Sequence, residues 1–261
     1  MTDSYFTTKD GSFFSPTDHT RGPWSAEACH AGPPAALMVR AVEALATHQQ
    51  LTRLTIELIK PIPMSGFRVQ SEVRRPGRSV THTEAEIYDD DGFYARAYGL
   101  HIRTLDSLDV AGMLADGPDL SSAVPGPFSI ASTHHNEEWF GSSIECKFPR
   151  VRTAANQGPT TMWMRTMYPI LPDVQPSSFQ RLAPLADCGN GISYHGEIGS
   201  TSFVNADLTL AVHREPIGDW FASRSVSHWH RSGIGMSDSE LFDKNGPVGR
   251  ATQSLVLNTF G

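Results

Sequence analysis

The chain has 261 residues, which is enough for one large domain or for two of roughly 100–150 residues each. A formal net charge of −7 and a sequence pI near 5.8 exclude nucleic acid as the main partner, because that partner needs a basic face. Three cysteines without metal-ligand spacing, a polar N-terminus and no apolar run of about 18 residues predict a cytoplasmic protein without a membrane span.

The first half of the chain predicts two short strands, one buried helix and a series of long strands. The short strands flank the turn at Lys9–Gly11, and the alanine-rich, apolar run that begins at Pro33 and continues to Gln49 predicts the helix. Strands are predicted at 51–62, 67–75, 79–89 and 93–104. Glycine-containing turns predict that the last three of these pair as antiparallel hairpins.

The second half repeats this order after a segment, 105–135, that lacks periodicity. A second helix is predicted over 176–189, capped by Ser177 or Ser178, shortened by Pro184 and ended by Gly189. Strands are predicted at 144–148, 160–168, 203–214, 219–230, 233–243 and 248–258. Each half is therefore expected to be an α+β unit of one helix and an antiparallel sheet.

Two segments, 77–97 and 231–251, are similar to each other at a fixed offset of 154 positions. The matched pairs are Tyr88 and Phe242, Asp89 and Asp243, Gly92 and Gly246, and Arg96 and Arg250. Internal similarity of this kind indicates a duplicated architecture. The copies also differ, since Gly99 of the first is matched by Gln253 of the second.

Three segments of the sequence resemble the acyl-CoA thioesterase-like family that is widespread in actinobacteria. They are HAGPPAALMVRA at 30–41, SFVNADLTLAVHREPIGDW at 202–220 and GPVGRATQSLVL at 246–257. They are similar, more distantly, to the type II acyl-CoA thioesterases. The resemblance implies an α+β, double hotdog fold, in which each repeat wraps an antiparallel sheet around a central helix. It divides the chain into an N-terminal hotdog (1–104), a connector (105–135) and a C-terminal hotdog (136–261).

The resemblance also implies an activity, the hydrolysis of a fatty-acyl or related acyl-CoA to free acid and CoA. Type II acyl-CoA thioesterases carry a catalytic Asp, Thr and Gln in the second hotdog. On this sequence the Asp falls at Asp187 and the Gln at Gln253, whereas the Thr position falls on Asn205. Asparagine lacks a hydroxyl group, although it still donates and accepts hydrogen bonds. A slipped alignment makes Asp207 or Thr209 a rival for that position.

Thioester hydrolysis needs a positioned water, a base that takes its proton, and donors aimed at the developing oxyanion. Asp187 is the expected base. Its place in the last turn of the 176–189 helix predicts a raised pKa, because the helix dipole disfavours an anion there. Gln253, on the last strand, is expected to share a water with Asp187.

The N-terminus of the first helix is the expected oxyanion and substrate site, formed by His30, Ala31 and Gly32. The two prolines that follow lack N–H groups, so the backbone donors must come from Ala31, Gly32 or Ala35. His30 is expected either to bind substrate or to cap this loop.

Two other functions are compatible with the sequence. The replacement of threonine by Asn205 favours a hotdog protein that binds acyl thioesters or apolar ligands without turnover. A hydratase or dehydratase needs a His–Asp pair, and the candidates His213 and Asp207 lie about 20 Å apart along one strand. The sequence predicts no metal site and no cofactor, because neither ligand spacing nor a phosphate-binding glycine motif occurs. Exposed sheet edges permit a homodimer.

Overall fold

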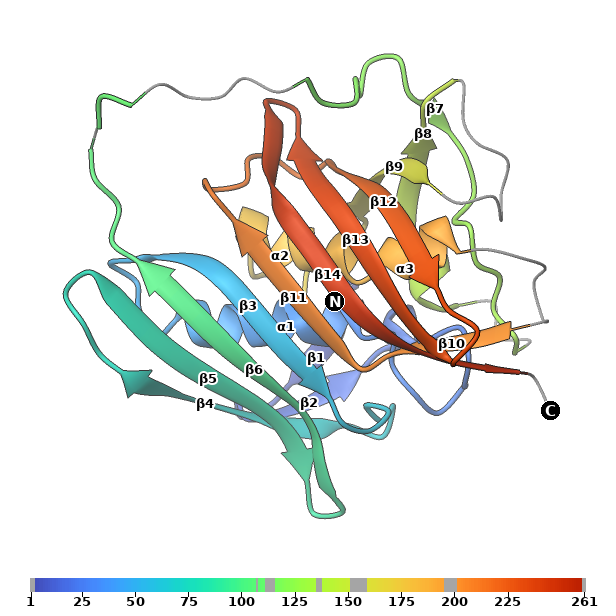
Figure 1. Cartoon of the computed structure of the whole chain (residues 1–261). Coiled ribbons are helices and arrows are strands. Elements are labelled where there is room, and N and C mark those ends of the chain that lie inside the picture. The colour runs from blue at the N-terminus through green and yellow to red at the C-terminus, as the bar shows by residue number, and fades with distance from the viewer. Residues whose placement is uncertain are drawn as a thin grey trace.

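The described part of the chain forms one antiparallel sheet that carries its helices on one face (Figure 1). The computed structural model describes residues 3–106, 108–110, 116–134, 138–150, 159–194 and 201–259. Within these ranges the strands make a single 14-stranded sheet. The strands are β1 (Phe6–Thr8), β2 (Phe13–Pro16), β3 (Gln50–Leu58), β4 (Phe67–Arg75), β5 (Val80–Asp89), β6 (Gly92–Ile102), β7 (Val124–Pro125), β8 (Ile144–Phe148), β9 (Thr160–Thr166), β10 (Thr201–Asn205), β11 (Asp207–Val212), β12 (Phe221–Trp229), β13 (Ile234–Asp243) and β14 (Gly246–Thr259). The helices are α1 (Gly32–Glu43), α2 (Ser178–Ala186) and α3 (Gly189–Ser193), with 3-10 turns η1 (Asp18–Thr20) and η2 (Phe140–Ser142).

The strands of the two halves follow the same order outward from the centre of the sheet. The order is β1-β2-β4-β5-β6-β3 and then β11-β14-β13-β12-β9-β8-β7. The hairpins β5–β6 and β13–β14 begin and turn at positions that are 154 residues apart, and both have a register irregularity at matching places, Ile87/Tyr88 and Leu241/Phe242. The β5–β6 hairpin predicted from the sequence is therefore present, and the second half repeats it as β13–β14 with the same register.

The halves meet where β3 pairs with β11 at the centre of the sheet. Thr55 lies opposite Thr209 in this pairing, and the Thr209 hydroxyl donates to Thr55 Oγ1 at 3.3 Å. These two residues are themselves separated by the repeat offset of 154 positions. A local two-fold axis between the matched strands consequently passes between Thr55 and Thr209.

Helices α1 and α2 lie antiparallel and contact each other at both ends. At one end Glu43 accepts hydrogen bonds from the Ser177 hydroxyl, at 3.0 Å to each carboxylate oxygen, and from Gln180 Nε2 at 2.6 Å. Ser177 is the N-cap of α2, since its hydroxyl accepts the Gln180 N–H at 3.1 Å. No helix in the described ranges is long and apolar enough to cross a membrane.

Both helices differ from their predicted lengths. α1 ends at Glu43, and the alanines before Gln49 form turns in which the Ala46 N–H bonds to the Glu43 carbonyl, because β3 must begin at Gln50. The sequence predicted that Gly189 ends the second helix. In the structure Gly189 instead begins the short helix α3. The chain bends at Asp187, which is the C-cap of α2.

The strand predicted over 203–214 is two strands, β10 and β11, which both pair with β14. Asn205 lies opposite Leu255 and Thr209 opposite Thr252, so the register shifts by one residue around Ala206. The side chains of Leu208, Leu210 and Val212 are buried and point inward. If side chains alternated without a break along one strand, Asn205 would therefore point outward. The shift instead places Asn205 opposite the buried Leu255, on the face that the helices cover.

Candidate functional site

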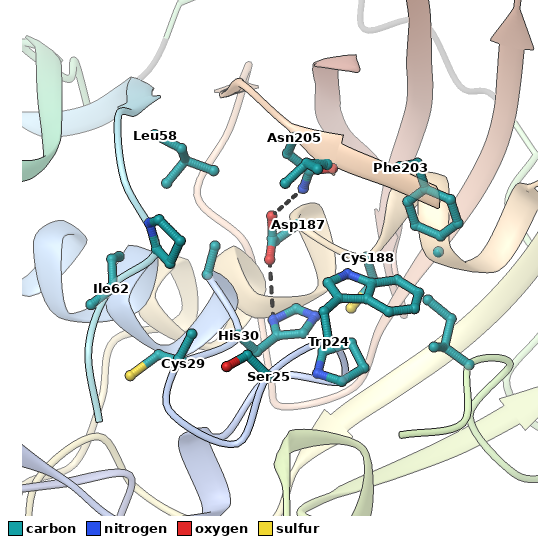
Figure 2. A pocket seen from close by; sticks show the side chains of 18 of the residues that line it. Trp24, Ser25, Cys29, His30, Leu58, Ile62, Asp187, Cys188, Phe203 and Asn205 are labelled. Carbon is teal, nitrogen blue, oxygen red and sulfur yellow. Dashed lines mark hydrogen bonds and ion pairs between the residues drawn. The ribbon is translucent and has the colours of Figure 1, made fainter. Parts of the chain in front are cut away.

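A cavity of about 520 Å³ opens where the N-terminus of α1 meets the C-terminus of α2 (Figure 2). Its walls come from residues within 22–31, 58–62, 128–133, 187–191 and 202–205. Most of these side chains are apolar, which suits an apolar ligand with few polar anchors. The wall at 128–133 belongs to the segment that the sequence predicted as a connector.

Asp187 is the buried acid of this cavity, with only 3% of its side chain exposed. Its Oδ2 lies 3.1 Å from His30 Nδ1, and its Oδ1 accepts from Asn205 Nδ2 at 2.8 Å and from Gln253 Nε2 at 3.2 Å. In Figure 2 the carboxyl group lies between His30 and Asn205, and it faces the space between Leu58 and Phe203. Residues from both halves of the chain thus converge on one carboxyl group.

Burial sets the acid–base properties of this pair. It raises the pKa of Asp187, and His30, Asn205, Gln253 and the Gly32 N–H only partly oppose that rise. It also lowers the pKa of His30, which the charge of Asp187 partly opposes. The predicted direction for Asp187 is thus confirmed, although desolvation rather than the helix dipole is its main cause.

The hydrogen bonds of His30 agree with these directions. The Gly32 N–H donates to His30 Nδ1 at 3.0 Å, so the 3.1 Å approach of Asp187 Oδ2 to the same nitrogen is best satisfied when Asp187 keeps its proton. The ring stacks on Phe140 with centroids 4.1 Å apart. His30 therefore both caps the loop and holds Asp187, whereas the sequence predicted either capping or substrate binding.

Gln253 supports Asp187 from behind and is not among the cavity-lining residues. It is 2% exposed, and its Nε2 donates to the Asp187 backbone oxygen at 2.8 Å as well as to Oδ1. Its Oε1 accepts the Asn190 N–H at 3.1 Å. The structure thus brings Gln253 to Asp187 directly, where the sequence predicted a shared water.

Asn205 lines the cavity and contacts Asp187, whereas its two rivals in the alignment make their hydrogen bonds elsewhere. Asp207 Oδ1 accepts the Ser254 N–H at 2.6 Å, and Thr209 bonds to Thr55 at the centre of the sheet. The position implied by the family resemblance is therefore the one that reaches the carboxyl group.

Of the three expected backbone donors at the start of α1, two already have partners. The Gly32 N–H donates to His30, and the Ala35 N–H donates to the Ala31 carbonyl at 2.9 Å. The Ala31 N–H has no hydrogen-bond partner within the described residues, and Ala31 lines the cavity. Of the three donors, Ala31 is thus the one with an N–H that the described residues do not engage.

The sequence did not predict two parts of the site. The aromatic wall, in which Trp24 meets Phe203 edge-on with centroids 5.2 Å apart, comes from segments without a motif. The pairing of His30 with Asp187 joins residues from different halves, so local sequence carried no signal for it. His213 and Asp207, the nearest candidates for a hydratase pair, are not among the residues that line the cavity, and Asp207 Oδ1 accepts the Ser254 N–H. In the part of the chain with defined positions, no cluster of three or more His, Cys, Asp or Glu residues could hold a metal ion.

Comparisons with known proteins agree with the geometry. Residues 20–102 match the family model of the acyl-CoA thioesterase N-terminal domain, and residues 116–257 match that of the C-terminal domain. Curated protein sequences gave no match.

Solved structures share the fold over nearly the full chain. A protein provisionally named a thioesterase from Novosphingobium aromaticivorans has a TM-score of 0.74 at 16% identity, covering 97% of this chain and 98% of that one. A hot dog protein of unknown function from Alicyclobacillus acidocaldarius has 0.73 at 14%, covering 97% and 96%. The acyl-CoA thioesterase II TesB2 from Mycobacterium marinum has 0.67 at 15%, covering 98% and 95%. The chain therefore has a hotdog fold.

The two family matches together cover most of the sequence, and the C-terminal match alone covers more than half of it. The chain belongs to the acyl-CoA thioesterase family.

Proposed function

We propose that this chain is an acyl-CoA thioesterase of double hotdog architecture that hydrolyses an acyl thioester to free acid and CoA. The family match supports the substrate class, and the local two-fold axis between Thr55 and Thr209 supports two tandem hotdogs. We assign residues 1–104 and 136–261 to the hotdogs and 105–135 to their connector. The observation that carries the reaction is the buried carboxyl group of Asp187 at the wall of an apolar cavity.

Asp187 acts as the general base in this proposal. In its ionised form it takes a proton from a water beside it, and the water oxygen attacks the thioester carbonyl. The protonated carboxyl group then donates to His30 Nδ1, the arrangement that the 3.1 Å contact favours. A raised pKa makes Asp187 a stronger base than an exposed aspartate, which suits it to this step.

The carbonyl oxygen is polarised by the Ala31 N–H. Negative charge develops on that oxygen as the water attacks, and a backbone donor already held in place stabilises it. Collapse of the tetrahedral intermediate breaks the C–S bond and releases the CoA thiolate, which takes the proton from Asp187. Apolar walls at Leu58 and Ile62 hold the acyl group.

Asn205 replaces the family's threonine in this scheme. Its Nδ2 must face Asp187, because its oxygen would repel the carboxylate, and it does so at 2.8 Å. This orientation leaves Oδ1 to accept a hydrogen bond from the attacking water. Asparagine thus supplies both the donor to the base and an acceptor for the nucleophile.

A panel of acyl-CoAs of increasing length, with release of free thiol as the readout, tests the proposal. We expect thiol release with a preference for some chain length. The second candidate, a hotdog that binds acyl thioesters without turnover, is favoured by Asn205 in the threonine position. Binding at every length without thiol release would support that candidate and contradict hydrolysis.

An unsaturated acyl-CoA belongs in the same panel, because His30 and Asp187 form the kind of pair that hydration of a double bond needs. Loss of the conjugated thioester absorbance without thiol release would indicate a hydratase and contradict the thioesterase assignment.

A further inference from the structure

Asn190 lies behind Asp187 in a buried polar network between α3 and the C-terminal strands. Asn190 as a whole is 1% exposed. The Asn190 N–H donates to Gln253 Oε1 at 3.1 Å, and Gln253 in turn contacts Asp187. Asn190 is thus one residue removed from the carboxyl group and is not among the residues that line the cavity.

The Asn190 N–H decides which way the Gln253 amide points. Gln253 Nε2 faces two acceptors, the backbone oxygen and Oδ1 of Asp187, while Oε1 faces a single donor, the Asn190 N–H. Only one orientation of the amide satisfies all three neighbours. With the amide reversed, its oxygen would face the oxygens of Asp187 and its NH2 group would face an N–H.

The side chain of Asn190 fixes the position of that N–H. Its Oδ1 accepts from the Ser227 hydroxyl at 2.9 Å and from Trp229 Nε1 at 3.1 Å, and both donors belong to β12. These two bonds tie the first turn of α3 to the sheet.

Gly189 lets α3 come this close to the strands. A Cβ atom at Gly189 would lie 2.6 Å from Ser239 Oγ and 2.7 Å from Ser237 Oγ, closer than real Cβ atoms come to other atoms. The absence of a side chain at position 189 therefore lets α3 lie close to the sheet, where the Asn190 N–H reaches Gln253.

We propose that Asn190 is a positioning residue that holds the Gln253 amide in the orientation in which it donates to Asp187. This inference rests on the proposed function, because it assigns Asn190 a part in preparing the base. Asn190 acts through Gln253 and does not touch the reacting atoms.

Loss of the Asn190 side chain should change the pKa of Asp187. Without the hydrogen bonds of the Asn190 side chain to β12, the Gln253 amide can turn or move away from Asp187. The ionised carboxylate then loses a donor, and the pKa of Asp187 rises further. The acidic limb of the pH profile of kcat/KM then moves to higher pH. Because the cavity wall is unchanged, kcat falls while KM stays the same. We expect kcat to fall roughly tenfold or more, since misplacing a catalytic group by about 1 Å can cost on the order of 10²-fold.

The test compares Asn190→Ala and Ser227→Ala with the control Ser225→Ala. Ser225 lies two residues from Ser227 on the same face of β12 and is 1% exposed against 2% for Ser227, but its hydroxyl bonds to Ser223 and Ser239. The first two variants should lower kcat and shift the acidic limb upward, and the control should do neither.

A second readout does not depend on turnover. The carboxyl carbon of Asp187 can be titrated by NMR in the full chain, with Asp187→Asn used to assign the signal. Its midpoint should rise in Asn190→Ala and Ser227→Ala and not in Ser225→Ala.

The outcomes test the positioning role of Asn190 and the proposed thioester hydrolysis separately. A folded Asn190→Ala protein with unchanged midpoint and pH profile, or an equal shift in Ser225→Ala, overturns the role of Asn190. If Asn190→Ala does not fold, Ser227→Ala decides alone. Absence of thiol release by the unaltered protein overturns the proposed function, while the titration still tests Asn190.

Discussion

At Asp187, residues from both halves of the chain meet a carboxyl group that burial has removed from water. The resemblance to type II thioesterases pointed to Asp187, and its expected place in the last turn of a helix predicted the direction of its pKa shift. The sequence predicted a different cause and no His30 contact, since burial and the approach of α1 to α2 are properties of the packed molecule. At this scale the sequence predicted which residue to consider, and the packed fold determines the burial and hydrogen bonds of its carboxyl group.

Replacement of Asp187 by asparagine should stabilise the folded protein, although it removes the proposed base. The pKa of Asp187 is raised in the folded state, so its contribution to stability is fully present below the unfolded pKa of about 3.9 and is lost as the pH rises through the folded pKa. We therefore expect Asp187→Asn to have a larger free energy of unfolding than the unaltered protein at pH 7. The measurement is denaturant unfolding at several pH values. A gain that grows rather than shrinks toward pH 4 would contradict this account.

An aspartate at position 205 should impair the base more than an alanine does. Asn205→Asp sets a second carboxylate against Asp187, where Nδ2 now lies 2.8 Å away, and like charges at that distance raise a carboxyl pKa further. The acidic limb of kcat/KM should move to higher pH, and turnover at neutral pH should fall by about tenfold or more. Asn205→Ala is the matched control, since it removes the donor without adding charge. Equal profiles for the two variants would show that charge at this position does not reach Asp187.

Among the elements, long periodic segments were predictable and their ends were not. The strands of both hairpins follow directly from alternation and glycine turns. The break at Ala206 did not, because Val204 and Asn205 fit one regular strand as well as two. Yet that one-residue shift turns Asn205 into the cavity. A short helix after Gly189 was missed for a similar reason, since glycine more often ends a helix than begins one.

The start of α2 offers a test of element stability. The sequence left Ser177 and Ser178 as alternative caps, and the structure selects Ser177, which also donates to Glu43 at the end of α1. We expect Ser177→Ala to lower the free energy of unfolding by about 1 kcal/mol, the usual cost of losing an N-cap. Ser178→Ala is the control, because its hydroxyl does not cap the helix and instead donates to the Gly218 carbonyl, at 3.4 Å. Urea unfolding of both variants measures the difference, and equal losses would contradict the assignment of the cap.

Over the whole molecule, the repeat predicted the arrangement of strands better than it predicted the site. The offset of 154 positions places β4, β5 and β6 on β12, β13 and β14 and even fixes the contact between Thr55 and Thr209. The two halves differ at the residues around the candidate site. Gln253 supports Asp187 in one half, whereas at the matching place in the other half Gly99 lies beside Thr83 and His101.

The first half has no room for a second copy of the Gln253 amide. A Cβ atom at Gly99 would overlap Thr83 Oγ1 and lie 3.2 Å from His101 Nε2. We expect Gly99→Gln to reduce the free energy of unfolding by about 1–3 kcal/mol, as overpacked cores do, and to add no second site. Denaturant unfolding and the number of acyl-CoA molecules bound per chain measure these two effects. A stable variant that binds a second acyl-CoA would contradict the asymmetry.

The most direct test of Asp187 as the general base is steady-state thiol release from the preferred acyl-CoA by the unaltered protein and by Asp187→Asn. We expect kcat to fall at least about 10²-fold, the scale of lost general-base catalysis, while acyl-CoA binding and the folded state persist. Unchanged turnover in a folded Asp187→Asn protein would show that this carboxyl group is not the base.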